Sequence, residues 1–499
     1  MSSKIIFWID GSLTSFCLAY YLQQKLDSDF FAIIESYEKP KNFFKNQKLV
    51  KFNKTWFYHD SFQEQKELDV KYLENFEKKY EIGLWELAIN ERIFYRFNRI
   101  YNFSDNEIKL ILEQECRLFE KILTENKPDF VIMFESTLHQ HELFYRLCKK
   151  IGVKPLILNQ PNIGRSIISE NSRKIDQKIE FDKIPCTNKS LNELREFRKS
   201  FGNYNTIKNY RYQFKTSNLE LLKATFKFFT QKNRHIKTLY THRGRTKFRV
   251  LLDETKLKIK RKIRFSFIEK NLEKKLPLNE NFVYFPLGVD EERNLLIGAP
   301  FYTNQIEIIR SIAKSLPIGY KLYVKENPAQ KIRFWRSISE YKEIINIPNV
   351  RLLHPDLPPE NIFEKCSLVI TVNGSSGLDA AFFGKPSIVF SDLGYAILPS
   401  VSKLNSIQEL PKLILTSLEK NVESTSLEKY LKVLYENSFD FDPMNFENKY
   451  NEVFYYNGHY YDVDISESKM KSFLEENKKT LESLTNNYLK KLDIHKKLL

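Results

Sequence analysis

The sequence contains few cysteines, and no two of them are spaced as a CxxC pair. The five cysteines stand at positions 17, 116, 148, 186 and 366. An odd number of widely spaced cysteines is not typical of a disulfide scaffold or of a zinc cage. A reducing compartment is therefore the simplest interpretation.

The sequence also lacks a long apolar run. Its longest uncharged stretch, residues 11–24, contains several polar side chains, whereas a membrane-spanning helix needs about 20 mostly apolar residues. The apolar start of the chain, KIIFWI at 4–9, meets Asp10 at once, which is not the pattern of a secretory signal. We therefore expect a soluble, cytoplasmic protein.

Several catalytic and binding motifs are absent as well. There is no G-x-S-x-G elbow, no HExxH, no Walker loop and no GxGxxG. His139 and His141 are two positions apart and do not share a helix face, so we expect no metal site there. No zinc finger, RNP or helix-turn-helix pattern indicates nucleic acid as a partner. Neither a metal nor a cofactor is therefore expected.

What the sequence does contain is enough apolar material for more than one core. Of its 499 residues, 42% are hydrophobic and 28% are charged, which is a globular composition. At about 100–200 residues per domain, two or three domains are expected.

The net charge of +16 is concentrated in one stretch. Residues 205–275 hold 21 Lys or Arg against 5 Asp or Glu, so the rest of the chain is close to neutral. This stretch has almost no β alternation, and we expect helices and loops in it. It is either a solvated linker or a surface that contacts an anionic membrane, an anionic glycan or a lipid-linked acceptor.

Both halves of the chain alternate short apolar runs with helical patterns, which indicates parallel sheets. In the first half, strands are predicted at 4–9, 29–35, 129–135 and 154–158, with helices at 13–25 and 138–150 and a helical period over 65–125. In the second half, strands are predicted at 281–287, 320–326, 349–354, 368–372 and 387–390, with helices at 304–315 and 378–383.

We therefore predict an α/β protein with two doubly wound Rossmann-type domains facing a cleft. Its segments would be an N-terminal α/β domain at 1–200, a basic helical linker at 201–280, a second α/β domain at 281–410 and a mainly helical C-terminal segment at 411–499. Ligands of open α/β sheets bind at the carboxyl ends of the strands, so the candidate site residues are those that follow strands.

The strongest motif is the turn NGSSG that follows the strand at 368–372. Gly374 and Gly377 let the backbone bend and approach a ligand. Ser375 and Ser376 can cap the next helix, whose free N–H groups attract an anion such as a nucleotide phosphate. The alternative is an ordinary strand–helix turn capped by serine.

Three other strand ends in the second domain carry polar residues. Lys325 and Asn327 end the strand at 320–326, His354 ends the strand at 349–354, and Asp290 and Glu292 follow the first strand of this domain. These side chains could contact phosphate or supply a base or a nucleophile. A plain turn and a solvated acidic loop are the alternatives.

The first domain offers a carboxylate and several acceptor-side residues. Glu135 follows the strand at 129–135 and could act as a general base or acid. Arg165 follows the strand at 154–158 in the segment LNQPNIGRS. Asp10, Gly11 and Ser12 end the first strand, where an acceptor would sit.

The run of motifs over about 281–395 resembles the capsule polysaccharide biosynthesis family, which includes bacterial Kdo transferases. The resemblance rests on FPL…E, LLIGAPFYTNQIEIIRSIAKSLPIGYKLYVKENP, NVRLLHPDLPP and GLDAAFFGKPSIVF. It implies a GT-B glycosyltransferase whose nucleotide-sugar lies on the second domain, with Ser375 and Ser376 in the nucleotide-binding turn. Glu292 fits the family's acid. The family has a His-Pro where this chain has Asn327 and Pro328, a departure that weakens the assignment of a CMP-Kdo donor.

The function expected from this resemblance is a metal-independent transfer of a sugar, from a CMP-Kdo-like or other nucleotide-sugar, to a polysaccharide or lipid-linked glycan acceptor. The enzyme would work in the cytoplasm, with an anionic membrane surface as a further partner. The alternatives are a nucleotide-sugar epimerase, a polyol-phosphate transferase, or a glycan-binding member that has lost its chemistry.

Overall fold

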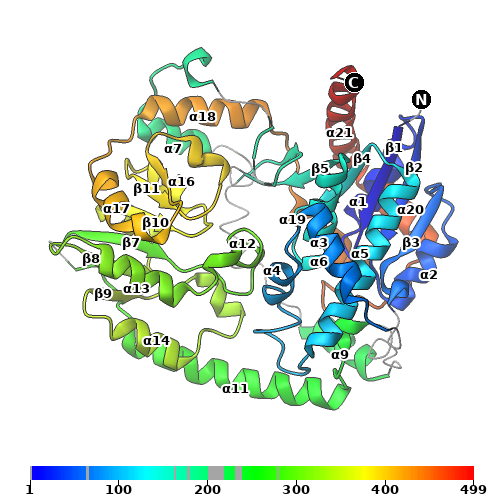
Figure 1. Cartoon of the computed structure of the whole chain (residues 1–499), viewed down its shortest axis with the longest axis horizontal. Helices are drawn as coiled ribbons and strands as arrows, with labels where there is room; N and C mark the ends of the chain where they lie inside the picture. Colours follow the sequence, from blue (N-terminus) through cyan, green and yellow to red (C-terminus); the bar gives the residue numbers. More distant parts are fainter. Residues whose placement is uncertain are drawn as a thin grey trace. The chain divides into compact units, whose positions relative to one another are not determined.

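The structure is a computed structural model that describes residues 3–62, 67–161, 164–172, 174–176, 180–199, 218–230, 239–277 and 280–498. The chain forms two compact units (Figure 1). Unit 1 comprises Met1–Asp176, Tyr212–Val250 and Ser438–Leu499, and unit 2 comprises Gln177–Arg211 and Leu251–Asn437. Each unit thus joins stretches that are far apart in the sequence.

Unit 1 is built on a six-stranded sheet in the order β3-β2-β1-β4-β5-β6. Its strands are β1 (Ser3–Ile9), β2 (Ser28–Ile34), β3 (Lys54–Phe57), β4 (Phe130–Phe134), β5 (Lys154–Asn159) and β6 (Ile167–Ser169). All neighbours are parallel except β5 and β6. The strand order reverses between β1 and β4, and this reversal creates the topological switch point where open α/β sheets bind ligands.

Both faces of this sheet are buried, as the alternation along β1 shows. Ile5, Phe7 and Ile9 belong to one apolar cluster, and Ile6 and Trp8 belong to another on the opposite face. Successive strand residues point to opposite faces, so a continuous apolar run is what a doubly covered strand requires.

The helices of unit 1 form two layers. One layer contains α3 (Val70–Tyr80), α4 (Leu84–Ile89), α5 (Asp105–Asn126) and α6 (His139–Ile151). The other contains α1 (Thr14–Leu22), α2 (Glu38–Asn46), α19 (Pro443–Phe454), α20 (Glu467–Glu476) and α21 (Lys478–Leu498).

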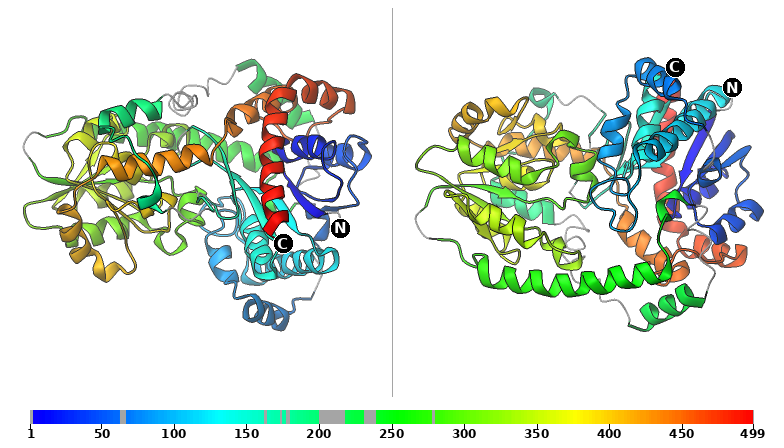
Figure 2. Two further views of the ribbon diagram at one scale, coloured as in Figure 1. Left: turned by 90° about the horizontal axis from the view of Figure 1, so that it is seen from above. Right: turned by 60° about the horizontal axis from the view of Figure 1, so that its bottom comes forward.

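The C-terminal helices therefore pack against one face of the first sheet. Helix α21 runs beside α1, as Figures 1 and 2 show. Phe446, Phe473 and Leu484 join the cluster that contains Ile5 and Phe7. One face of the N-terminal sheet is thus covered by α1 and α2 together with helices from the last sixty residues of the chain.

Unit 2 repeats the same topology with a second six-stranded sheet, in the order β12-β11-β10-β7-β8-β9. Its strands, all parallel, are β7 (Phe282–Pro286), β8 (Lys321–Lys325), β9 (Val350–Leu353), β10 (Leu368–Thr371), β11 (Ser387–Val389) and β12 (Val401–Lys403). Its switch point lies between β7 and β10.

The helices of unit 2 lie on both faces of its sheet. Val283 and Phe285 of β7 belong to one cluster, and Phe282 and Tyr284 belong to another. The helices are α7 (Leu191–Lys199), α12 (Arg293–Leu296), α13 (Gln305–Ser315), α14 (Ile338–Ile345), α15 (Pro359–Lys365), α16 (Ser376–Ala381), α17 (Leu410–Leu418) and α18 (Ser424–Glu436).

Two helices occupy the described part of the basic stretch. They are α9 (Asn218–Thr230) and the long α11 (Lys247–Asn271), which is the straight green helix in Figure 2. Among the helices of the described residues, none combines the length and the apolar character that crossing a membrane requires.

The predicted fold class is confirmed. Each unit is a doubly wound Rossmann-type domain, and two such domains in one chain are the components of a GT-B-like fold. All nine predicted strands are present. The structure adds three short strands, β3, β6 and β12, at or next to the sheet edges. That the two domains face a common cleft stays a prediction.

Candidate functional site

Several predicted residues of unit 2 follow the two strands that flank its switch point. Because β7 pairs with β10, the segment after Pro286 and the turn after Thr371 emerge at the same edge of the sheet. The first segment carries Asp290 and Glu292, and the second carries the turn at 374–377.

A buried asparagine joins these segments. The side-chain amide of Asn373 donates to the carbonyl oxygen of Asn294 over 2.6 Å, and its oxygen accepts from Ser391 Oγ at 3.0 Å. A Cβ on Gly298 would lie 1.7 Å from Asn373 Nδ2, so only glycine fits there. Asn373 was not among the predicted site residues, although its position at the end of a buried strand could have indicated it.

The glycines of the turn serve packing inside the protein. A Cβ on Gly377 would lie 2.7 Å from Tyr395 Oη, and one on Gly374 would lie 2.7 Å from Thr371 Oγ1. Ser375 and Ser376 are half-buried, and helix α16 begins at Ser376. The Gly374 N–H donates to Thr371 Oγ1 over 3.2 Å. The first N–H groups of a helix have no acceptor within it, so those of Ser375 and Ser376 could bind an anion.

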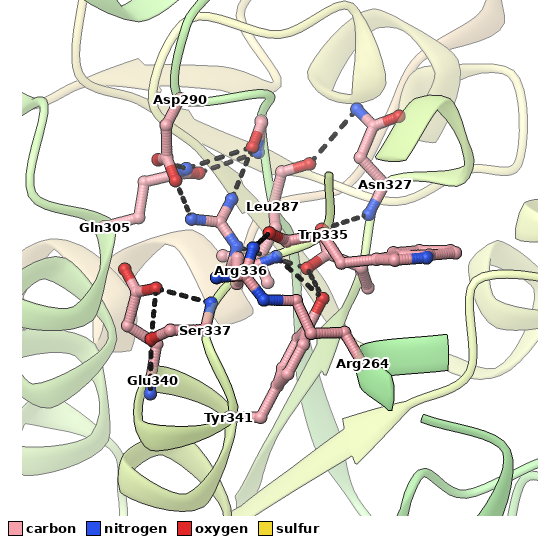
Figure 3. A network of polar contacts seen from close by, with 12 residues as sticks. Arg264, Leu287, Asp290, Gln305, Asn327, Trp335, Arg336, Ser337, Glu340 and Tyr341 are labelled. Carbon is pink, nitrogen blue, oxygen red and sulfur yellow. Dashed lines mark hydrogen bonds and ion pairs between the residues drawn. The ribbon is translucent and has the colours of Figure 1, made fainter. Parts of the chain in front are cut away.

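The segment after β7 contacts a buried network of polar side chains centred on Arg336 (Figure 3). Its guanidinium forms ion pairs with Asp290 and, over 3.2 Å, with Glu326. Tyr341 Oη donates to Glu326 over 2.8 Å. Two carboxylates thus pair with one guanidinium. Burial raises the pKa of Glu326, and the positive charge of Arg336 opposes this rise.

The same network fixes the backbone that follows β7. Gln305 accepts from the Gly288 N–H at 2.7 Å and donates to Asp290 Oδ1 over 2.7 Å. Arg336 donates to the Gly288 carbonyl over 2.7 Å. Asp290 is therefore held by two side chains within the protein, an arrangement that positions the loop.

Asn327 bridges two loops. Its side-chain amide donates to the Leu287 carbonyl over 3.3 Å, and its oxygen accepts from the Ala329 N–H at 2.9 Å. Lys325, next to it, is buried. A role for either residue in binding phosphate stays a prediction.

Glu292 and His354 each have a partner. Arg333 donates to Glu292 over 2.9 Å and lies 3.5 Å from Glu291. His354 is buried, with Nε2 3.1 Å from Glu269 and Nδ1 accepting from the Asp356 N–H at 3.2 Å. Since Nδ1 accepts, the proton of a neutral His354 lies on Nε2.

In unit 1, Asp10 lies at the switch point. It directly follows β1, and the Ser12 N–H donates to its Oδ1 over 2.8 Å. Gly11 is exposed. Burial raises the pKa of Asp10 from 3.8 to about 6; the charge of His141 opposes this shift, and the carboxylates of Glu35 and Glu447 add to it.

Two residues of this site were missed from the sequence. Glu35 directly follows β2, and His141 lies in the first turn of α6, where its Nε2 is 2.9 Å from Glu35 Oε2. Burial alone would raise the pKa of Glu35, but the hydrogen bond and charge of His141 lower it to about 2. Burial alone would lower the pKa of His141, but Glu35 and Asp10 raise it.

The C-terminal segment also reaches this site. Glu447 and Tyr450 of α19 lie close enough to Asp10 to interact electrostatically, as does Tyr455. Tyr461 lies near Gly11, because a Cβ there would be 3.9 Å from Tyr461 Cδ1. The strand ends and the last sixty residues thus build one site.

His139 has a separate, internal role. Its ring lies between Glu91 and Glu115, each 3.0 Å away, and all three side chains are buried. Burial alone would lower the pKa of His139, but the two carboxylates raise it to about 10.

The remaining predicted residues of unit 1 hold its chain in place. Glu135 accepts a hydrogen bond from Ser172. Arg165 donates to Ser438 Oγ over 2.8 Å and to its carbonyl over 3.1 Å, and so tethers the chain where it returns to unit 1. Their predicted parts in catalysis and acceptor binding are not tested by these contacts.

Comparisons with solved structures give only distant similarities. The alignment with the UDP-GlcNAc 2-epimerase of Methanocaldococcus jannaschii covers 87% of this chain and 100% of that one, at 12% identity and a TM-score of 0.26. Thermosulfurimonas dismutans KpsC, a beta Kdo 2,7 transferase, aligns over 71% of this chain and 97% of its own, at 13% identity and 0.30. Anabaena HepE, in complex with UDP and glucose, aligns over 90% and 98%, at 10% identity and 0.28.

The family comparison is more informative. No curated protein matches the chain significantly. The model of the family described as capsule polysaccharide biosynthesis protein matches residues 193–421. This range contains the whole second sheet and extends well beyond the motifs that carried the resemblance. The match thus confirms the resemblance over residues 193–421 of the chain.

Proposed function

We propose that this protein is a metal-independent glycosyltransferase of capsule polysaccharide biosynthesis. It moves a sugar from a nucleotide-sugar, bound at the β7/β10 edge of unit 2, to a hydroxyl of a polysaccharide or lipid-linked glycan, bound at the β1/β4 edge of unit 1. A CMP-Kdo-like sugar is one candidate donor. The observation that carries the proposal is the family match, which covers the second sheet and the turn at 374–377 that follows β10.

The turn and its neighbours suit the leaving nucleotide. In the transfer, the bond between the anomeric carbon and the donor phosphate breaks, and the electron pair goes to the phosphate. Preorganised N–H groups stabilise charge that develops in this way. The half-buried Ser375 and Ser376 supply such groups, and Asn373 holds the loops beside them.

Asp10 is the carboxylate best suited to take the proton of the acceptor hydroxyl. Asp290 is held by Arg336 and Gln305, and Glu292 is paired with Arg333. Asp10 is partly exposed, and its pKa of about 6 leaves it ionised at neutral pH but still basic. The new bond joins the acceptor oxygen to the anomeric carbon as Asp10 accepts the proton.

The function is tested by incubating the full chain with a panel of nucleotide-sugars and capsular oligosaccharides in EDTA, followed by mass spectrometry. We expect an oligosaccharide one sugar longer and the free nucleotide. Restoration by Mg²⁺ of activity lost in EDTA would refute metal independence. Conversion of a donor to its epimer in the absence of an acceptor would show that the protein is an epimerase and not a transferase. Nucleotide binding without turnover would indicate a binding protein.

The anion site is tested by replacing Ser375 with proline. Ser375 has φ −74°, which proline adopts readily, so the substitution removes one N–H with little strain. If the turn holds the donor phosphate, Ser375→Pro should weaken nucleotide binding about tenfold, the loss of roughly one charge-assisted hydrogen bond of about 1.5 kcal/mol. The readout is the rise in melting temperature that the nucleotide causes.

Ser375→Ala is the matched control, since it removes the hydroxyl and keeps the N–H. It should bind nucleotide like the wild type. Gly377→Val is unsuitable, because the added Cβ would meet Tyr395 and disturb the fold itself. Equal binding by the proline and alanine variants would place the phosphate elsewhere.

A further inference from the structure

Helix α9 presents an apolar stripe to solvent. Leu219, Leu222, Phe226 and Phe229 are spaced by three, four and three residues, which places them on one face of the helix. They are 42–70% exposed, whereas Ala224, on the other face, is 4% exposed. The helix therefore packs through one side and leaves large apolar side chains uncovered on the other.

Helix α11 repeats this pattern along its own length. Phe248, Leu252, Ile259 and Ile263 recur at intervals of four, seven and four residues and are 43–69% exposed. Leu257 and Ile268, three turns apart on the opposite face, are buried. We call the four exposed apolar residues of α9 the docking stripe.

Apolar exposure of this kind is concentrated in these two helices. Half of the large hydrophobic side chains that are exposed in the described residues belong to α9 or α11. Single exposed apolar residues are normal on a protein surface, but a contiguous set marks an interaction site. A linker that is merely solvated would not need them.

Positive charge borders the docking stripe. Lys223 and Lys227 lie beside it on α9. On α11, Lys256, Lys260 and Lys262 accompany the exposed apolar residues of that helix. Lys247, at the start of α11, donates to the Phe229 carbonyl over 2.6 Å and so joins the two helices. An apolar face with bordering lysines is the pattern of a helix that lies in a membrane interface.

We propose that the docking stripe and its lysines bind the protein to an anionic membrane surface. The apolar side chains would enter the boundary between headgroups and acyl chains, while the lysines contact anionic headgroups. This inference does not rest on the proposed chemistry. A second copy of the chain is a poorer occupant, because pairing like surfaces would bring lysines against lysines.

The test is flotation of the full chain with vesicles. Vesicles of phosphatidylglycerol and phosphatidylcholine in equal parts should bind the protein, and vesicles of phosphatidylcholine alone should bind it weakly. The double variant Leu222→Ser, Phe226→Ser should lower partitioning about tenfold or more, because two apolar side chains no longer leave water.

The matched control is the double variant Ile318→Ser, Leu415→Ser. It also removes two exposed apolar side chains, but from outside the docking stripe, and its binding should equal that of the wild type. Melting curves check that both variants stay folded. The charge variant Lys223→Glu, Lys227→Glu should lose the preference for anionic vesicles.

A second measurement reports how deeply the docking stripe enters the bilayer. In a Phe226→Trp variant, brominated acyl chains should quench the added fluorescence when the protein is bound. Unchanged vesicle binding by the Leu222→Ser, Phe226→Ser variant would overturn the proposal. So would a wild-type dimer in the absence of lipid that this variant converts to a monomer while vesicle binding persists.

Discussion

Replacing Arg336 with methionine should destabilise unit 2 by about 3–5 kcal/mol, the usual cost of leaving buried charge without its partner. Arg336 is the cation that Asp290 and Glu326 share, and its side chain is almost fully buried. Methionine keeps much of the volume and removes the charge. Trp335, the one tryptophan in the sequence range of unit 2, provides a fluorescent signal for urea unfolding.

The pH dependence of this destabilisation gives a second readout. Burial already raises the pKa of Glu326 above its usual 4.5, so near and above this value the folded state binds more protons than the unfolded state. Stability then rises as the pH falls. Without Arg336, which opposes this rise, Glu326 should protonate more easily, and the deficit of the variant should shrink towards pH 4.5.

Arg310→Met is the control, because Arg310 pairs with Glu307 and Glu343 at the surface. It should cost about 0–1 kcal/mol. If Arg336→Met proved equally mild, the network would not be what holds the loop after β7. Adding Asp290→Asn and Glu326→Gln to Arg336→Met should recover part of the lost stability.

The sheets could be predicted from the sequence because their strands are covered on both faces. Runs such as KIIFWI and LVITV are almost entirely apolar, and each ends at a polar turn. The short strands β3, β6 and β12 carry three or four residues each. Pairing with a neighbouring strand decides their conformation, and a local pattern does not reveal it.

The helices of the C-terminal segment were predicted, but their place was not. An amphipathic pattern shows that a helix has an apolar face, and it does not show which sheet covers that face. Here the contacts join residues that are more than 400 positions apart, as in the bond from Tyr21 Oη to the Leu474 carbonyl. Such pairings have no local signal.

The candidate site, like the fold, was predictable only in part. Strand ends led to Asp10 and to the turn at 374–377, since both switch points follow from the order of the strands. The sequence did not reveal that Arg336 and Arg333 already occupy Asp290 and Glu292. It also did not reveal that Glu35 and His141 meet beside Asp10.

Replacing Asp10 with asparagine should lower kcat by about 10²–10⁴-fold, the range that a general base contributes. Asparagine keeps the shape of the side chain and an oxygen for the Ser12 N–H, but it cannot accept the acceptor's proton. Binding of the nucleotide to unit 2 should be unchanged. Transfer assays at saturating donor, together with the thermal shift, separate these two effects.

The pH profile of activity should report the ionisation of Asp10. With a pKa of about 6, Asp10 is protonated at lower pH, so kcat/KM of the wild type should fall about tenfold for each pH unit below that value and level off above it. The groups facing Asp10 are Glu35, His141 and Glu447. Glu35 titrates near 2, well below this step. The pKa values of His141 and Glu447 are both raised, so the Asp10→Asn variant is needed to assign the step. The slope should be absent in Asp10→Asn.

Stability distinguishes a catalytic from a structural role for Asp10. Its pKa is raised on folding, so the folded state binds more protons than the unfolded state between pH 3.8 and about 6, and the ionised form costs stability above that range. Asp10→Asn should therefore be at least as stable as the wild type at pH 7 while being far less active. Glu135→Gln is the comparison, and it should change kcat little. If Glu135→Gln abolished transfer and Asp10→Asn did not, the proton would go to Glu135 instead.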